Sequence, residues 1–478
     1  MLDLVNGLPN ISFSEKDIER LSPHKKPAFS NISNIAFDKV ISSFGIVLHM
    51  HQPTIPAASA DLGKAALISN LQYMMEHPDI GDNHNAVVFL ECYSRMSDII
   101  RELVKEGANP RVMLDYSGNL LWGLAQIEDG RVLDNLRLVT TEKKYQRYVE
   151  WTGTMWSHAV VSSTPVPDIK LHIAAWREHF ASIFGLEAVK RVQGFSPPEM
   201  HLPIHPDVCF EYVKALKECG YEWIVVQEHT VENLDGSGIK RPHLPHVLVA
   251  KNSKGEVQKI TALVKTQGSD SKLIGQMQPY YEAKSCGLEE YAGKKIVPYV
   301  IQVGDGENGG VMMNEFPPAY KKAFAEISTQ GVVGMNGSEY LEFVKTGLDE
   351  KDFIPLQPVS QHRIWQIVDD YRPGACDQAI EKIKEKDQNY NLDKASWTND
   401  RSWVQGYEDV LDPMHKLSVE FHKKLDSKKV DPKDPAYRQA LLYLLLSQTS
   451  CFRYWGEGAW TDYAKEIIKR GMEALASV

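Results

Sequence analysis

Ile296-Val297-Pro298-Tyr299-Val300-Ile301-Gln302-Val303 is an apolar run, and Gly304-Asp305-Gly306-Glu307-Asn308 follows it directly. The run is rich in β-branched residues and predicts a buried strand, and the Gly-Asp-Gly sequence marks its end. Parallel α/β proteins carry their chemistry at the carboxyl ends of strands. We therefore expect Asp305 and Glu307 at such a site, although Asp, Gly and Asn are also typical of a plain turn.

A third carboxylate stands in a stiff context earlier in the chain, in Gly194-Phe195-Ser196-Pro197-Pro198-Glu199-Met200. Its two prolines fix φ, so Glu199 has little backbone freedom, which suits a preorganised nucleophile. The alternative is a structural turn with a surface glutamate. Two carboxylates on separate strand ends, Glu199 and Asp305, indicate acid/base or nucleophilic chemistry on a sugar bond.

The length of 478 residues and the hydrophobic content of 43% predict a globular protein with two domains, one of them a large barrel. A formal net charge of −10 argues against nucleic acid or an anionic membrane as the main partner. The N-terminus lacks a basic start and a long apolar stretch, and no window has the apolar length of a membrane span. We expect a cytoplasmic protein; the sequence gives no indication of its oligomeric state.

The six cysteines lie far apart, and no Cys-x-x-Cys pair occurs. This spacing favours scattered buried thiols over a disulfide framework or a zinc site. We expect no metal and no cofactor in the site.

Residues 1–40 are mixed and polar, and we expect an N-terminal extension packed on the outside. In residues 41–335 short apolar runs alternate with helical patterns, which predicts right-handed crossovers and a parallel sheet. The predicted strands are residues 44–48, 86–90, 112–114, 191–195, 223–227 and 298–303. Helices are predicted over 168–184 and 208–219, with Asp168 as an N-cap and Gly185 ending the first helix.

Strand signals fade in residues 336–478, where 382–386, 413–425 and 437–447 have helical patterns. Residues 440–446 are apolar nearly all round, so this helix is expected to be buried. We infer a helical C-terminal domain that packs against the barrel.

His49 and His51 follow the apolar residues 44–48. Side chains at positions i and i+2 of a strand point to the same side, so both rings can enter one barrel mouth. Two imidazoles on one face suit either a divalent cation or the hydroxyl groups of a substrate. A third interpretation is structural, with one buried and one exposed histidine.

Aromatic residues are dense in the stretch 451–460, which contains Trp455 and Trp460. Sugar rings present apolar C–H faces that stack on indoles, so tryptophan in a cleft suits a carbohydrate. Most tryptophans are core residues, but we expect this stretch to face the barrel mouth.

The order of these segments resembles glycoside hydrolase family 57, whose members act on α-glucans. The similar segments are His51-Gln52-Pro53, Ser117-Gly118-Asn119-Leu120-Leu121, His158 with the proline-rich residues 164–168, Gly194 to Met200, Asp305-Gly306-Glu307 and the region of Trp455. The resemblance spans roughly residues 41–465. It implies an α/β fold, an incomplete (β/α)7-type barrel over 41–335 with a helical domain over 336–478 that completes the active-site cleft.

The resemblance also implies roles for individual residues. Glu199 is the implied nucleophile and Asp305 the implied general acid/base of a retaining α-glycosidase or glucanotransferase, and their environments must push their pKa values apart. The other implied site residues bind an α-glucan or oligosaccharide substrate; they are His49, His51, Gln52, His158, Glu307, Trp455 and Trp460.

Two departures from the family pattern bear on the substrate. Ser196 stands where an aromatic residue often lines the site, and residues 309–315 replace a more aromatic continuation. Two other functions are consistent with the sequence. One is a metal-dependent hydrolase that uses His49, His51 and Asp305. The other is a non-catalytic carbohydrate-binding protein on the same scaffold.

Overall fold

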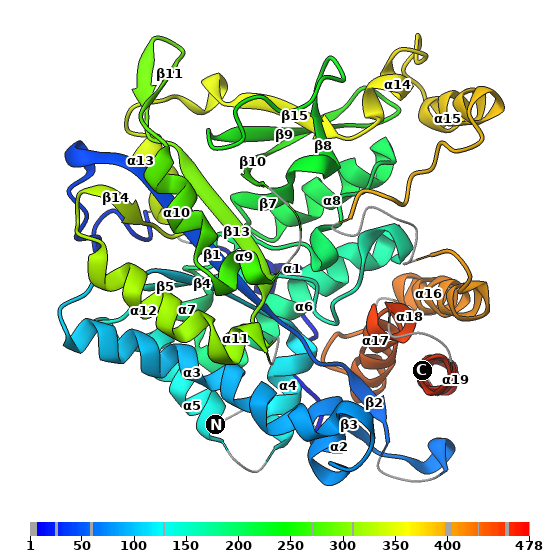
Figure 1. The fold of residues 1–478 in the computed structure, drawn as a ribbon. Helices are drawn as coiled ribbons and strands as arrows, with labels where there is room; N and C mark the ends of the chain where they lie inside the picture. The colour runs from blue at the N-terminus through cyan, green and yellow to red at the C-terminus, as the bar shows by residue number, and fades with distance from the viewer. Residues whose placement is uncertain are drawn as a thin grey trace.

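The computed structural model describes residues 7–23, 27–57, 61–127, 130–266, 268, 271–307, 310–396, 404–428, 430–454 and 458–477. Its centre is a barrel of seven parallel strands, each paired with the next along the chain (Figure 1). The strands are β1 Val40–Met50, β4 Val112–Tyr116, β5 Val149–Gly153, β6 Gly194–Phe195, β7 Trp223–Gln227, β10 Val257–Lys265 and β13 Tyr299–Asp305. The pair between Lys265 and Ile301 joins β10 to β13 and closes the ring.

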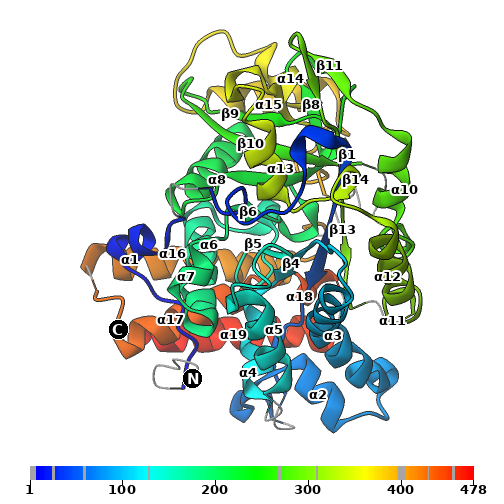
Figure 2. The same cartoon turned by 90° about the vertical axis from the view of Figure 1, so that its left-hand side faces the viewer.

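Helices between the strands cover the outside of the barrel (Figure 2). Strands β4, β5 and β7 are buried along their whole length, as expected where helices cover a parallel sheet. The covering helices include α3 Ala86–Lys105, α4 Gly118–Gln126, α5 Arg131–Thr141, α6 Val166–Phe184, α8 Pro206–Glu218, α10 Gln278–Ser285 and α12 Phe316–Glu326.

Further strands pair with two strands of the barrel, β1 and β10. Strand β14 (Gly331–Gly334) is parallel to β1, and β9 (His246–Lys251) is antiparallel to β10. Beyond β9 lie β15 (Ile354–Pro358) and β8 (Val231–Asn233). Two small hairpins pair β2 (Thr54–Pro56) with β3 (Leu67–Ser69) and β11 (Glu289–Tyr291) with β12 (Lys294–Ile296).

The amino-terminal end of the barrel is filled by α13 (Gly337–Val344) and by large aromatic side chains. The Tyr299 ring stacks on Tyr340 with 4.5 Å between centroids, and the Trp223 Nε1–H donates to Ser338 Oγ at 2.9 Å. A Cβ at position 45 would lie 1.9 Å from the Tyr299 hydroxyl oxygen, so Gly45 is what gives this ring its space. The interior is therefore a packed core at this end.

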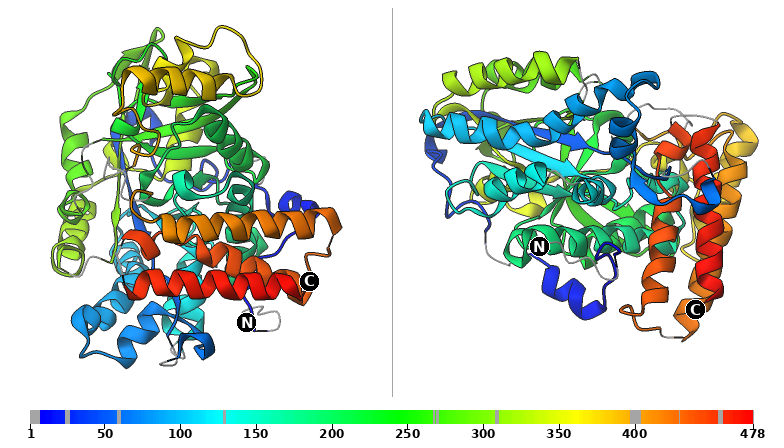
Figure 3. Two further views of the ribbon diagram at one scale, coloured as in Figure 1. Left: turned by 90° about the vertical axis from the view of Figure 1, so that its right-hand side faces the viewer. Right: turned by 90° about the horizontal axis from the view of Figure 1, so that it is seen from below.

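The C-terminal part of the chain forms a layer of helices beside the barrel. Helices α16 (Glu408–Lys428), α17 (Pro435–Ser447) and α19 (Ala459–Ala476) lie side by side (Figure 3, left). A short α18 (Cys451–Tyr454) connects to the barrel mouth, and α14 (Gln361–Trp365) and α15 (Ala375–Lys386) lie farther along the barrel (Figure 1). The predicted (β/α)7-type barrel with a helical C-terminal region is confirmed.

At the N-terminus, α1 (Glu15–Leu21) packs against α6 from outside the barrel. The Arg20 guanidinium lies 3.2 Å from the Glu178 carboxylate on α6.

Two local predictions were wrong. Residues 86–90 begin α3: Ala86, Leu90 and Tyr93 recur with a helical period on the buried face, whereas Val87 is 70% exposed. The pair of β-branched valines had favoured a strand there. The other error concerns Asp168, which lies inside the first turn of α6, where the N-cap is Pro165.

The carboxylate of Asp168 does not cap α6 but binds side chains of the C-terminal helical layer. It accepts hydrogen bonds from His422 Nε2 at 2.7 Å and from Gln448 Nε2 at 2.6 Å. Gly185 ends α6 as expected, with a positive φ of 91°.

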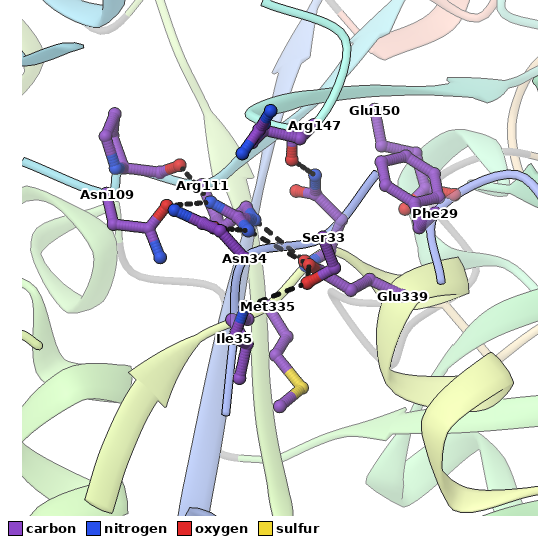
Figure 4. A network of polar contacts seen from close by, with 12 residues as sticks. Phe29, Ser33, Asn34, Ile35, Asn109, Arg111, Arg147, Glu150, Met335 and Glu339 are labelled. Carbon is purple, nitrogen blue, oxygen red and sulfur yellow. Dashed lines mark hydrogen bonds and ion pairs between the residues drawn. The ribbon is translucent and has the colours of Figure 1, made fainter. Parts of the chain in front are cut away.

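A buried ion pair connects three segments that are distant in the sequence, at the amino-terminal end of the barrel (Figure 4). The Arg111 guanidinium donates two hydrogen bonds to the Glu339 carboxylate, from Nε at 2.7 Å and from Nη2 at 2.9 Å. The same guanidinium donates to Asn34 and Asn109, so every face of the ion pair has a polar partner. Both side chains are almost fully buried. The network fixes α13 in the barrel end.

Substitution of Arg111 by methionine should lower the free energy of unfolding by about 3 to 5 kcal/mol, because the buried Glu339 carboxylate loses its counter-charge. Arg137→Met is the matched control, since its ion pair with Asp134 is exposed and should contribute less than about 1 kcal/mol. Urea denaturation measures both changes. Equal effects of the two substitutions would contradict a structural role for the Arg111 network.

Candidate active site

A pocket opens at the carboxyl ends of the barrel strands. Val303 and Met200, which belong to the packed interior, form part of its wall, so the pocket sits directly on the core of the barrel. Most of its other lining residues are polar or ionisable. The full lining consists of His49, His51, His158, Ser196, Pro197, Glu199, Met200, Val303, Asp305, Glu307, Ser450 and Cys451.

Glu199 is held in an unusual backbone conformation after β6. Its φ of 55° lies in the left-handed region, and Met200 follows with φ 49°. The backbone N–H of Ser196 donates to the carbonyl of Gly153 at 2.8 Å, and that of Met200 to Pro197 at 3.0 Å. Non-glycine residues adopt positive φ only where the surroundings enforce it, and such residues are concentrated at functional sites. The Pro-Pro segment thus holds the Glu199 carboxyl in the pocket.

Three imidazole rings form a stack in the pocket. The His158 ring lies between the other two, 4.6 Å from the His49 centroid and 4.3 Å from the His51 centroid. His158 also has a left-handed backbone, with φ 59°. Because three stacked cations would repel one another in a buried site, the three rings cannot all be charged.

His49 is the charged member of the stack. Its Nδ1 lies 2.9 Å from Asp115 Oδ2, and the Asp115 side chain is 1% exposed. Burial alone would lower the pKa of His49, but the negative charge and hydrogen bond of Asp115, helped by Asp305 and Glu307, raise it to about 10. His49 is therefore a permanent imidazolium at neutral pH.

His51 and His158 are neutral. Burial and the neighbouring His49 charge lower the pKa of both rings well below the ordinary value. The Nδ1 atom of His51 lies 2.7 Å from Ser117 Oγ, and that of His158 lies 2.7 Å from Ser450 Oγ. Both Nε2 atoms are buried and have no hydrogen-bond partner among the described residues. These two nitrogens are available to the hydroxyl groups of a ligand.

The three carboxyl groups of the pocket share one electrostatic environment. Burial and the charge of Asp305 raise the pKa of Glu199 to about 8, and the same two causes raise that of Glu307 to about 8. Burial likewise raises the pKa of Asp305, and His49 opposes the shift. The pKa values of Glu199 and Asp305 are thus both raised, whereas the expected separation would need one raised and one lowered value.

Glu307 also contacts the backbone just after the end of β1. Its Oε1 accepts the His51 N–H at 3.1 Å, and its Oε2 is buried without a partner among the described residues. Ser196 Oγ is likewise buried and unpartnered. Both atoms are therefore free to bind polar groups of a ligand.

Six of the predicted site residues meet in this pocket: His49, His51, His158, Glu199, Asp305 and Glu307. The other three do not line it or cannot be placed. Gln52 is buried beside it and accepts a hydrogen bond from Asn70 Nδ2 at 2.9 Å. Trp460 lies in the first turn of α19 with its ring edge against Tyr463. Trp455 lies outside the described residues.

Ser450 and Cys451 also line the pocket; the sequence had indicated the stretch that begins at Cys451, but not Ser450. They follow α17 and dock where Thr449 pairs with Ala159 in an antiparallel bridge. Asn119 Nδ2 donates to Thr449 Oγ1 at 3.3 Å and strengthens this contact. The expected placement of the stretch 451–460 at the barrel mouth therefore holds for its first residue.

Comparison with known proteins bears on the family and the fold. The model of glycosyl hydrolase family 57 matches residues 45–258. The predicted resemblance to family 57 is confirmed. The match begins within β1 and ends within β10, so it includes Glu199 and the three histidines of the pocket. No curated protein matches the sequence.

Solved family 57 structures share the fold. A 4-α-glucanotransferase from Thermococcus litoralis is similar with a TM-score of 0.56 and 18% identity, over 92% of this chain and 60% of the other. A branching enzyme from Thermococcus kodakaraensis has a TM-score of 0.56 and 13% identity, over 91% of this chain and 88% of the other. A branching enzyme from Pyrococcus horikoshii has a TM-score of 0.51 and 14% identity over the same shares. This chain thus spans less than two thirds of the glucanotransferase.

The described residues offer little to a metal ion. No group of three or more His, Cys, Asp or Glu side chains among them is arranged to hold a metal ion. The Nδ1 atom of His49 is already directed at Asp115. All six cysteines are free thiols; five are buried, and Cys286 is partly exposed. Among the helices that the structure describes, none combines the length and apolar character needed to cross a bilayer.

The raised pKa of Glu199 predicts a pH-dependent cost in stability. A carboxyl group whose pKa rises on folding from 4.5 to about 8 stabilises the fold below pH 4.5 and loses this contribution as the pH rises through 8. The Glu199→Gln variant has no ionisable group at this position. The free energy of unfolding of the variant minus that of the wild type should therefore increase as the pH rises from about 5 to about 9.

Urea denaturation at several pH values measures this difference. Glu473→Gln is the control, because Glu473 is an exposed residue of α19. A difference between Glu199→Gln and the wild type that is constant with pH would show that Glu199 has an ordinary pKa.

Proposed function

We propose that the pocket is the active site of a retaining α-glycosidase or glucanotransferase that acts on α-glucans or their oligosaccharides. The observation that carries this proposal is the meeting of Glu199 and Asp305, 106 positions apart in the sequence, across one pocket at the barrel mouth. The match to family 57 and the shared fold of glucan-active enzymes support the substrate class.

Glu199 is proposed as the nucleophile. Its carboxylate attacks the anomeric carbon and forms a glycosyl-enzyme, while Asp305 gives a proton to the leaving oxygen. Asp305 then takes a proton from water or from an acceptor hydroxyl, which attacks the same carbon and releases Glu199. Two inversions at one carbon retain the α configuration.

The mechanism needs a protonated Asp305 and an ionised Glu199 when the sugar is bound. Burial raises the pKa of both groups, that of Glu199 to about 8, and the charge of Asp305 adds to the shift of Glu199. The His49 cation opposes both shifts and so helps one of the two carboxyl groups to ionise. His51 and His158, neutral and with free Nε2 atoms, are proposed to bind hydroxyl groups of the cleaved sugar.

The C-terminal helices complete this site in the proposal. Ser450 bonds His158, and His158 Nδ1 lies 3.9 Å from Glu199 Oε1. Residues 336–478 are therefore proposed as a domain that shapes the cleft, beside the barrel of residues 41–335. The six free thiols suit a reducing compartment, and a cytoplasmic location is proposed.

Glu199→Gln and Asp305→Asn should each abolish measurable turnover of maltooligosaccharides, with losses of at least about 10² to 10⁴-fold for the general acid/base. Chromatography of the products, together with NMR of the anomeric proton, measures activity and configuration. Circular dichroism checks that each variant is folded. Full activity in either variant, or a β-configured product of the wild type, would contradict the assignment.

Incubation with a chelator should leave turnover of the same substrates unchanged, because the proposed mechanism uses carboxyl groups and no metal. The measurement compares initial rates before and after dialysis against EDTA. Loss of activity that zinc restores would favour the metal-dependent hydrolase that the histidine pair also allows.

A further inference from the structure

Asp115 is a buried carboxylate that the proposed chemistry does not use. It lies on β4, is 1% exposed and is not among the residues that line the pocket. Its Oδ2 bonds His49 Nδ1 at 2.9 Å, and its Oδ1 has no other partner among the described residues. A buried carboxylate is costly unless it is paired, and His49 is the partner that the structure gives Asp115.

Strand register places Asp115 and His49 in one row with a catalytic group. His49 on β1 is the register partner of Asp115 on β4 and also of Asp305 on β13. The imidazolium therefore stands between two carboxyl-bearing positions on three adjacent strands, at a single level of the barrel. A shift of one residue in either register would turn the side chains to opposite faces and break the row.

The groups that face His49 come from every element around it. Asp115 lies on β4, Asp305 and Glu307 follow along β13 and the turn after it, and Glu199 acts from the segment after β6. His51 and His158 contribute neutral rings. The pocket thus holds three carboxyl groups, and His49 is the cation whose charge acts on all three.

We propose that Asp115 is a positioning residue that keeps His49 protonated, so that the pocket retains one positive charge beside Glu199, Asp305 and Glu307 throughout the reaction. This inference rests on the proposed function. Asp115 acts on the catalytic carboxyl groups through the charge of His49. Asp115 keeps the proton on His49, and the His49 cation favours the ionised form of the carboxyl groups. Without Asp115, burial favours a neutral imidazole, and the carboxyl groups of the pocket lose their counter-charge.

Asp115→Asn tests this, because asparagine keeps the shape of the side chain and removes its charge. NMR of protein with ¹⁵N-labelled histidine measures the His49 protonation state directly. In the wild type His49 should keep both ring protons at pH 8; in Asp115→Asn it should lose one proton at or below neutral pH. Glu150→Gln is the matched control, since Glu150 is a buried carboxyl on the neighbouring strand β5 that bonds Ser338 at the other end of the barrel.

The pH profile of kcat/KM on a maltooligosaccharide provides the second measurement. Loss of the His49 charge raises the pKa values of both catalytic carboxyls, so the whole profile of Asp115→Asn should move to higher pH by about one unit, a tenfold loss on the acid side. Glu150→Gln should leave the position of the profile unchanged. A purely structural role of Asp115 would lower activity at every pH without moving the profile.

The outcomes are distinct. A wild-type His49 that titrates near its ordinary pKa, or an Asp115→Asn variant that keeps the His49 proton, would overturn the proposal whatever the activity. A neutral His49 in Asp115→Asn with an unmoved pH profile would overturn it as well. If the wild type turns over no glucan, the proposed function fails, while the NMR measurement still decides what Asp115 does to His49.

Discussion

Parallel strands in a closed ring end at the same rim, and the candidate site depends on this constraint. His49, Asp115 and Asp305 are distant in the sequence, yet the register of β4, β1 and β13 puts them on one level. The residues after β5 and β6 bring His158 and Glu199 to the same rim. The opposite rim is filled by α13 and tied by the Arg111–Glu339 ion pair. One end of the barrel thus provides rigidity, and the other end presents the ionisable groups.

The pocket holds more carboxyl groups than cations, and this imbalance affects which groups keep their protons. Three carboxyl groups share the space with one imidazolium, while two further imidazoles stay neutral. Each additional ionised carboxyl would repel those present, so protons are retained near neutrality. Such a site can both donate a proton and present a carboxylate, which is the combination that double displacement at a sugar carbon requires. The strained backbone at Glu199 and His158 is consistent with positions held for function.

The sequence predicted the barrel and most of the pocket because their signals are local. The apolar run before Asp305 and the prolines before Glu199 are visible in a few consecutive residues. Asp115 was missed because its role arises from register with His49. Strand β5 was missed because Glu150 interrupts its apolar pattern, and only the tertiary contact with Ser338 offsets the burial of this carboxyl. Residues 86–90 were misassigned because two valines outweighed a helical period that becomes visible only over the next turns.

The bond from Ser450 to His158 links the end of the chain to a loop almost 300 positions earlier. During synthesis the barrel strands leave the ribosome long before Ser450 does, so a newly made barrel has its carboxyl groups but lacks the hydroxyl that orients one of its imidazoles. The arrangement of the His158 ring in the pocket is therefore completed only after the helices of the C-terminal layer have docked.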